Sequence, residues 1–397
     1  MSTKFFTTIL KGALSCVFVG GACADEPSLA GLGQRIFRDT SLSEPAGQGC
    51  ISCHSPANAF ADPRRVSPGA VAGREGHRNA PSLMYASLIP PLKLEDTYDE
   101  NGEVEYIVEG GLFHDGRAQT QLEQVRKPFF DQNEMNIAGP TELAVKFRKS
   151  EYADELKKLS GEEAWDDDDE LNEVAYRALV EFLREPMFRP FSAPIDDYWA
   201  GNKKALTLSQ RRGLDLFETA GSCSKCHLVG VSVWPNPLLS DYGYDNIGAP
   251  SGSKKDPGLG GVTGLKEELG QFRVPSLRNV ALTAPYLHNG SLKTIREVIE
   301  FYNKRDLEPE RWGATDFPES VNHEDLGNLK LSDQQVDDLT ALMDAFTDRI
   351  FLKMKPGQVF PAVPKGVPST AERKAFFLNS PARVDVMQPR RSIEPPE

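Results

Sequence analysis

The sequence predicts a mainly α-helical protein built from two similar domains. The pentapeptide Cys-x-x-Cys-His occurs twice, at Cys50–His54 and at Cys223–His227. A segment with helical spacing and the pattern Gly-x-x-x-Phe precedes each copy, at Gly33–Phe37 and at Gly213–Phe217. Strand-like alternation of apolar and polar residues is scarce. A repeated helix followed by a repeated motif indicates two units of one architecture.

Each pentapeptide is the attachment motif of c-type haem. The two thiols bind the haem vinyl groups, and the adjacent histidine becomes the proximal iron ligand. We therefore expect two covalently bound haem c groups in two cytochrome c-like domains packed about an interface. A zinc site or a redox disulfide is the alternative, but neither needs a histidine after the second cysteine. The expected attachment residues are Cys50, Cys53, His54, Cys223, Cys226 and His227.

Residues 1–24 have the features of a cleavable secretory signal peptide. Lysines precede an apolar run at 12–21, and the segment ends in Ala22-Cys23-Ala24, a small-residue cleavage pattern. A lipoprotein signal is the alternative, although neither Cys16 nor Cys23 follows a leucine at position minus three. Cleavage would leave only haem thiols, which suits an oxidising compartment. We expect the protein in a bacterial periplasm.

The length of the remaining chain suggests two domains. We place an N-terminal cytochrome c domain at residues 25–195 and a C-terminal one at 196–355, joined near Pro186–Pro194. Residues 356–397 are rich in proline and are expected to form an extended tail.

Further helices follow from spacing and capping signals. Apolar residues recur at helical spacing over Leu171–Phe182, and the acidic run at 166–170 suits the N-terminus of that helix. In the second domain, Thr207 or Ser209 would cap the helix before the haem motif. A capping box at Ser332–Gln335 begins the last helix.

The charge of the chain limits its partners. The 397 residues include 45 lysines and arginines against 58 aspartates and glutamates, a formal net charge of −13. We expect no nucleic-acid partner, and no segment after the signal peptide is apolar enough to span a membrane. An acidic surface favours docking of a basic small redox protein, although solubility alone would also explain the charge.

The second axial ligand of each iron separates an electron carrier from an enzyme. A methionine closes the iron to ligands, whereas an open position can bind peroxide. The loop before the last helix contains no methionine. The candidate ligands of the second iron are Tyr302, His288 and His323.

Several stretches resemble the signatures of the bacterial di-haem cytochrome c peroxidase and MauG family. Residues 272–280 read Phe-Arg-Val-Pro-Ser-Leu-Arg-Asn-Val, and 284–291 read Ala-Pro-Tyr-Leu-His-Asn-Gly-Ser. The first domain matches at 78–82 and 113–117. The matches at single positions are Gln124, Pro128, Glu134 and Met135. The resemblance covers the chain from Gly31 to Asp348.

The resemblance implies that the first haem is the peroxide site, with His54 as proximal ligand. Gln124, Pro128 and Glu134 would form the distal pocket. Peroxide heterolysis needs a group that moves a proton from one oxygen to the other, and Glu134 is our acid/base candidate. Gln124 would hold the peroxide, and Pro128 would shape the pocket. For an isolated glutamate, a solvated loop charge is the alternative.

The resemblance also implies the axial ligands. Tyr302 matches the position where peroxidases proper have methionine and MauG-like proteins have tyrosine, so we expect the second haem to be His227/Tyr302. His323 is the rival ligand. His77 stands near the position of a histidine that caps the first iron in peroxidases proper. We expect instead an open first haem and a surface role for His77.

Three further positions bear on the family pattern. His114 replaces a tryptophan that lies between the haems, and a hydrogen bond from His114 to a propionate is an equally good interpretation. Gly221 replaces a tryptophan that lies near the protein substrate in MauG. Asn79, Thr283 and Pro285 match a calcium site between the domains, where oxygen donors suit a hard cation.

Three functions follow as hypotheses. The first is reduction of hydrogen peroxide with electrons relayed through the second haem from a small cytochrome c or cupredoxin. The second is a MauG-like oxidase that modifies a tryptophan or tyrosine of a partner protein. The third is a non-enzymatic di-haem electron carrier, which would not need Glu134 and Gln124. We prefer the first.

Overall fold

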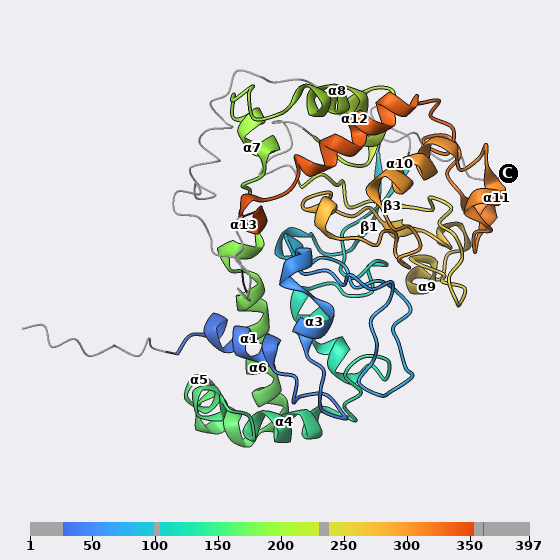
Figure 1. The fold of residues 1–397 in the computed structure, drawn as a ribbon. Helices are drawn as coiled ribbons and strands as arrows, with labels where there is room; N and C mark the ends of the chain where they lie inside the picture. The colour runs from blue at the N-terminus through green and yellow to red at the C-terminus, as the bar shows by residue number, and fades with distance from the viewer. Residues whose placement is uncertain (1–26, 99–103, 230–237, 353–359, 361–397) are drawn as a thin grey trace, which may run out of the picture.

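The computed structural model describes residues 27–98, 104–229, 238–352 and 360. Its α-helices are α1 (Leu29–Arg38), α2 (Cys50–Cys53), α3 (Gln121–Phe130), α4 (Pro140–Arg148), α5 (Ala153–Asp166), α6 (Asp168–Leu183), α7 (Pro194–Trp199), α8 (Leu208–Glu218), α9 (Gly260–Thr263), α10 (Ile295–Lys304), α11 (Pro309–Trp312), α12 (Asp333–Asp344) and α13 (Arg349–Leu352). Short 3-10 turns lie at Pro56–Asn58, Ala86–Leu88, Pro186–Phe188, Cys223–Lys225, Lys266–Glu268, Val280–Leu282 and Pro318–Ser320. The fold is mainly helical, as predicted (Figure 1).

The repeated Gly-x-x-x-Phe pattern marks two equivalent helix pairs. In the first half of the chain α1 packs against α6, and in the second half α8 packs against α12. A Cβ on Gly33 would lie 1.9 Å from the Ala178 carbonyl oxygen, and one on Gly213 would lie 2.2 Å from that of Asp338. Only glycine therefore allows these helices to approach so closely. Phe37 and Phe217, one turn later, are fully buried.

The predicted helix ends agree with the structure. Thr207 caps α8 and Ser332 caps α12, each in a capping box whose side chain accepts a hydrogen bond from the third helical residue. The acidic run begins α6, where Asp167 is the N-cap and accepts from the backbone of Asp169 and Glu170. These local signals identify the helices without knowledge of the fold.

The strands were missed. Strand β1 (Lys93–Tyr98) pairs antiparallel with β2 (Val104–Glu109), and β3 (Tyr244–Asp245) pairs antiparallel with β4 (Phe272–Arg273). The sequence did carry a signal for the first pair, because Asn101-Gly102 stands between the two runs and this dipeptide favours a tight hairpin turn. The second pair is too short for a periodic pattern.

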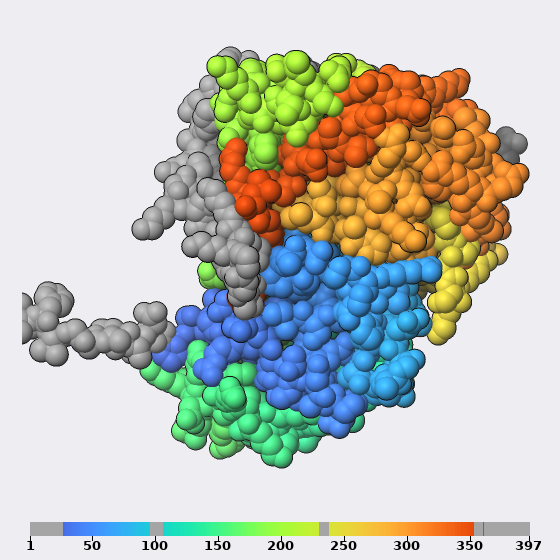
Figure 2. Space-filling view, viewed as in Figure 1, coloured from blue at the N-terminus to red at the C-terminus, as the bar shows by residue number. Residues whose placement is uncertain are grey.

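Two large hydrophobic cores follow one another along the described residues, and a third, small cluster contains Leu292, Phe301 and Trp312. The first includes residues from Leu32 to Phe191, and the second includes residues from Ala193 to Phe346. Figure 2 shows a lower lobe coloured from blue to green and an upper lobe coloured from yellow-green to red. Ile350 on α13 returns to the first core, and the ring of Phe360 packs there too. The domain limits drawn from the sequence remain a prediction.

Two sequence predictions fall outside the described residues. These are the signal peptide at 1–24 and, except for Phe360, the tail at 356–397. Among the described residues, no helix is both long enough and apolar enough to cross a membrane.

We expect Gly33→Ala to lower the free energy of unfolding by about 1–3 kcal/mol, the usual cost of overpacking a tight contact. The added methyl group must push α1 away from the Ala178 carbonyl. Denaturant titration would measure the change. Gly139→Ala is the matched control, because a Cβ there meets nothing within 4 Å. Equal stability of both variants would contradict the close-packing argument.

Candidate active site

The two haem motifs are presented in the same way. The backbone N–H of His54 donates to the Cys50 carbonyl, and that of His227 donates to the Cys223 carbonyl, both at 2.9 Å. The His54 Nδ1 lies 3.0 Å from the Phe60 carbonyl oxygen, and the His227 Nδ1 lies 2.8 Å from that of Leu239. A hydrogen bond at Nδ1 fixes the tautomer and leaves Nε2 as the nitrogen suited to an iron. Both histidines therefore fit a proximal ligand.

In the described residues, the four cysteines of the two motifs form no disulfide. No cluster of three His, Cys, Asp or Glu side chains is arranged to hold a metal in this part of the chain.

A cavity of about 440 Å³ opens beside the first motif. Its walls combine the proximal His54 with residues from both halves of the chain. The candidate site residues that line it are Cys53, His54, Asn79, His114, Gln124, Pro128 and Glu134. His77 is exposed and also lines the cavity. The structure thus brings together residues spread over some eighty positions of sequence.

Helix α3 and the loop after it form the wall that carries the distal candidates. Gln124 and Pro128 are four residues apart, so they share one face of α3. Pro128 has no N–H and cannot donate to the Gln124 carbonyl. The loop then turns back, because the Glu134 N–H donates to the Asp131 carbonyl and the Met135 N–H donates to the Pro128 carbonyl. This turn returns Glu134 to the face of Gln124 and Pro128.

A second segment holds the Glu134 loop. The Ala70 N–H donates to the Glu134 carbonyl at 2.8 Å, and a Cβ on Gly69 would lie 2.6 Å from the Asn133 carbonyl oxygen. Arg74 donates to the Gln132 carbonyl and to the Asn136 side chain. The loop is therefore fixed on both sides of the glutamate.

Glu134 has the electrostatics of an acid/base group. Burial, together with the charge of Asp131, raises the pKa of its carboxyl to about 7, although the charge of Arg117 acts in the opposite direction. A carboxyl group with a pKa near neutrality can both take and return a proton under working conditions. A solvated loop carboxylate would not show this shift.

The candidate ligands of the second iron lie in different surroundings. Burial raises the pKa of the Tyr302 hydroxyl well above its usual range, and the nearby Cys226 and Cys223 thiols raise it further. Tyr302 therefore lies close to the second haem motif. The His323 side chain is 62% exposed and bonds Asp306 at 2.9 Å. His288 lines the first cavity, where its ring stacks on Phe272. Tyr302 is buried near the cysteines of the second motif, so it stays our candidate ligand.

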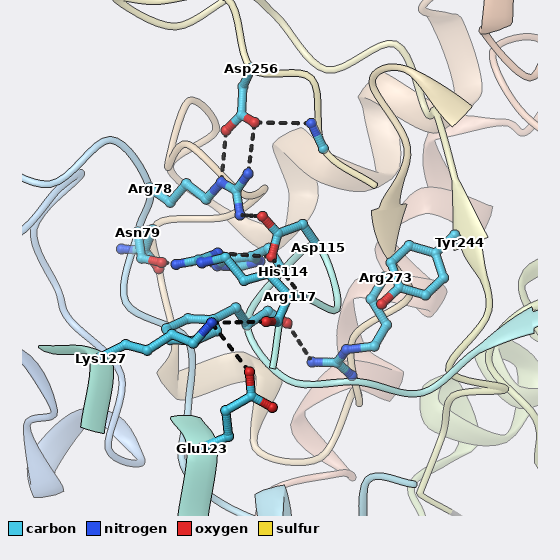
Figure 3. A network of polar contacts seen from close by, with 12 residues as sticks. Arg78, Asn79, His114, Asp115, Arg117, Glu123, Lys127, Tyr244, Asp256 and Arg273 are labelled. Carbon is cyan, nitrogen blue, oxygen red and sulfur yellow. Dashed lines mark hydrogen bonds and ion pairs between the residues drawn. The ribbon is translucent and has the colours of Figure 1, made fainter. Parts of the chain in front are cut away.

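A polar network joins the two lobes at the cavity (Figure 3). The Arg78 guanidinium donates two hydrogen bonds to Asp256, each at 2.7 Å, and pairs with Asp115 at 2.6 Å. The His114 Nε2 lies 2.9 Å from the Asn79 carbonyl oxygen. Burial, with the charge of Arg78, lowers the pKa of His114 to about 3. His114 is therefore a neutral, anchored imidazole at neutral pH.

No sequence motif marks Asp256 as part of this network. Asp256 lies 178 positions from Arg78, in a segment of glycines, lysines and serines without a periodic pattern. Arg78 and Arg273 belong to the family signatures, but the signatures assign neither residue a role. Their positions at the interface come from the fold.

Asn79, one residue of the expected calcium site, contacts the segment that follows Pro285. The Asn79 N–H donates to the carbonyl of His288, three residues after Pro285. The Asn79 amide nitrogen donates to the carbonyls of Asp62 and Arg64. The side-chain oxygen is the remaining group, and an oxygen donor suits calcium.

Comparison with known proteins gives consistent matches. A family model described as di-haem cytochrome c peroxidase matches residues 27–204. The chain is 33% identical over 356 residues to the methylamine utilization protein MauG of Paracoccus denitrificans, covering 82% of this chain and 89% of MauG. It is 30% identical over 287 residues to the cytochrome c551 peroxidase of Pseudomonas aeruginosa, covering 70% of this chain and 72% of that protein.

Among solved structures, the chain is similar to the diheme peroxidase BthA of Burkholderia thailandensis. The TM-score is 0.74 at 32% sequence identity, and the match covers 85% of this chain and 91% of BthA. A MauG-like protein associated with microbial copper homeostasis matches with a TM-score of 0.64 at 27% identity, covering 83% of this chain and 91% of that chain.

Proposed function

Because this chain belongs to the family of di-haem cytochrome c peroxidases and MauG proteins, we propose that it reduces hydrogen peroxide to water at its first haem site. The family is enzymatic and includes peroxidases. Glu134 is the observation that carries the proposal, since its carboxyl has a pKa near 7 beside Gln124 and Pro128 in the His54 cavity. A simple electron carrier needs no such group.

Haem bound at the first site would supply an iron that binds peroxide and is oxidised by it. The chain supplies the rest. The Phe60 carbonyl orients His54. Glu134 would take the proton from one peroxide oxygen and return it to the leaving oxygen, while Gln124 would hold the peroxide by hydrogen bonds. Pro128 adds apolar surface without a competing donor. Two electrons and two protons convert each peroxide to two waters.

The cofactors and the donor are part of the same proposal. Thioether bonds at Cys50, Cys53, Cys223 and Cys226 would hold two haem c groups, the second relaying electrons to the first. The donor would be a small cytochrome c or cupredoxin in the periplasm, reached after cleavage of residues 1–24. Calcium would bind between the domains through the Asn79 side chain and the carbonyls of Thr283 and Pro285.

A MauG-like oxidation of a partner protein is the second candidate. It is favoured by Tyr302, which lies by the second motif, and by the similarity to MauG. The substitutions His114 and Gly221 count against it, because imidazole is much harder to oxidise than indole.

Adding hydrogen peroxide to the fully oxidised protein separates the two candidates. Near-infrared and Soret spectra that stay constant until one haem has been reduced would indicate a reductively activated peroxidase and would count against Tyr302 as a ligand. A prompt change in the oxidised protein would favour the MauG-like candidate. Peroxide consumption with a reduced small cytochrome c then tests turnover directly. Its absence with every donor would reject the proposed function.

Tyr302→Phe is expected to change the spectrum of one haem only. Removing the hydroxyl removes the proposed ligand of the second iron and leaves the first site intact. Optical and electron paramagnetic resonance spectra of the oxidised protein would measure the change. His323→Ala is the matched control and should leave both haems unchanged. A wild-type spectrum in Tyr302→Phe would exclude phenol ligation.

A further inference from the structure

Arg273 is a half-buried cation that forms no ion pair among the described residues. Its Nη2 donates to the Phe113 carbonyl at 3.2 Å, and its Nε–H is buried without a hydrogen-bond partner. The carboxylate whose charge acts on Arg273 is that of Asp115, but Asp115 already pairs with Arg78 and Arg117. Burial lowers the pKa of Arg273, but an arginine stays charged. A buried guanidinium with an unused donor is costly unless an anion completes it.

The position of Arg273 indicates where that anion would lie. Arg273 lines the cavity that contains His54, and Figure 3 shows its side chain between Tyr244 and the His114–Arg117 segment. Other cations of the cavity differ from it. Arg78 pairs with both Asp115 and Asp256, while Lys254 and Lys255 are exposed.

Arg273 also connects the two haem sites. Its backbone N–H donates to the His114 carbonyl at 2.8 Å, and its guanidinium lies 5.5 Å from the centre of the Tyr242 ring. The segment that contains Tyr242 encloses the second motif, because the Leu239 carbonyl bonds His227 and the Asp241 N–H donates to the Cys226 carbonyl. A charge at Arg273 therefore acts on both sites.

We propose that Arg273 binds a carboxylate, a propionate of the first haem, and that this contact raises the reduction potential of that haem. The inference rests on the proposed function only in taking the His54 cavity as a haem site. The planar guanidinium can donate two hydrogen bonds to one carboxylate. The negative charge of an unpaired propionate favours ferric over ferrous iron. Pairing the propionate with Arg273 offsets this charge, so the iron is easier to reduce.

Spectroelectrochemical titration of the holoprotein tests the proposal without peroxide. Arg273→Gln should lower the equilibrium constant for reduction of the first haem at least tenfold, which is 59 mV for one electron. The second haem should shift in the same direction by less. Lys254→Gln is the matched control. It removes an exposed cation from the same cavity and should shift the potentials far less, because solvent screens that charge.

Unchanged potentials in Arg273→Gln would overturn the proposal, as would an equal shift in Lys254→Gln. If Arg273→Gln does not fold, Arg273→Lys keeps the charge but loses the planar fork. The resonance Raman band of the propionate bend should then move in Arg273→Lys, and an unmoved band would overturn the contact. Absent peroxide turnover in the wild-type protein would reject the proposed function and leave these potentials interpretable.

Discussion

Glu134→Gln is expected to lower peroxide turnover by about 10²–10⁴-fold, the range for loss of a general acid/base. The amide keeps the size and polarity of the side chain but cannot take a proton from peroxide. Both haems should remain attached, and their spectra in the absence of peroxide should be unchanged. Steady-state consumption of peroxide with a reduced donor measures the effect.

The pH profile gives a second measure of Glu134. The carboxylate form takes the proton first, and burial raises the pKa of this group to about 7. Activity should therefore rise with pH, with a midpoint near 7, and this rise should be missing in Glu134→Gln. Glu163→Gln, an exposed position on α5, is the control. Near-normal turnover in Glu134→Gln would remove the residue from the mechanism.

Replacing both cysteines of the first motif is expected to abolish peroxide turnover completely. Without the Cys50 and Cys53 thiols the first haem has no covalent attachment, and His54 alone has to hold it. The purified variant should carry one haem per chain, measured by intact mass and by the haem absorbance per protein. The haem that remains should keep the spectrum of the His227 site.

The reciprocal variant is the control. Replacing Cys223 and Cys226 should also leave one haem per chain, but that haem should still change its spectrum when it binds peroxide or cyanide. If peroxide turnover persisted after loss of the first motif, the first haem would not be the reaction site. Retention of two haems per chain would contradict covalent attachment at these cysteines.

The sequence predicted those parts of the fold that depend on local signals. The helices α6, α8 and α12 combine apolar spacing with a capping residue, so each could be placed before its partner was known. The purpose of Gly33 and Gly213 was not predictable, because the carbonyls they approach belong to helices more than a hundred residues away.

The site was predicted as a set of residues, and the fold supplied its electrostatics. Glu134 was chosen from the family pattern, whereas its raised pKa depends on burial and on Asp131, which follow from the turn after α3. Asp256 has no counterpart in any sequence pattern, and the family signature that contains Arg273 gives no sign of its surroundings. Each acquires its role from residues of the other lobe.

The hydrogen bonds of the two proximal histidines have a wider consequence. In both sites Nδ1 meets a backbone carbonyl, an uncharged acceptor, rather than a carboxylate. Neither imidazole is therefore drawn towards an imidazolate, and the two ligands donate to iron with similar strength. In the proposed function, a difference between two such matched centres would therefore arise on the side of each haem away from its histidine. Glu134 would act there at the first centre and Tyr302 at the second, so a duplicated scaffold could be specialised by changing only that side.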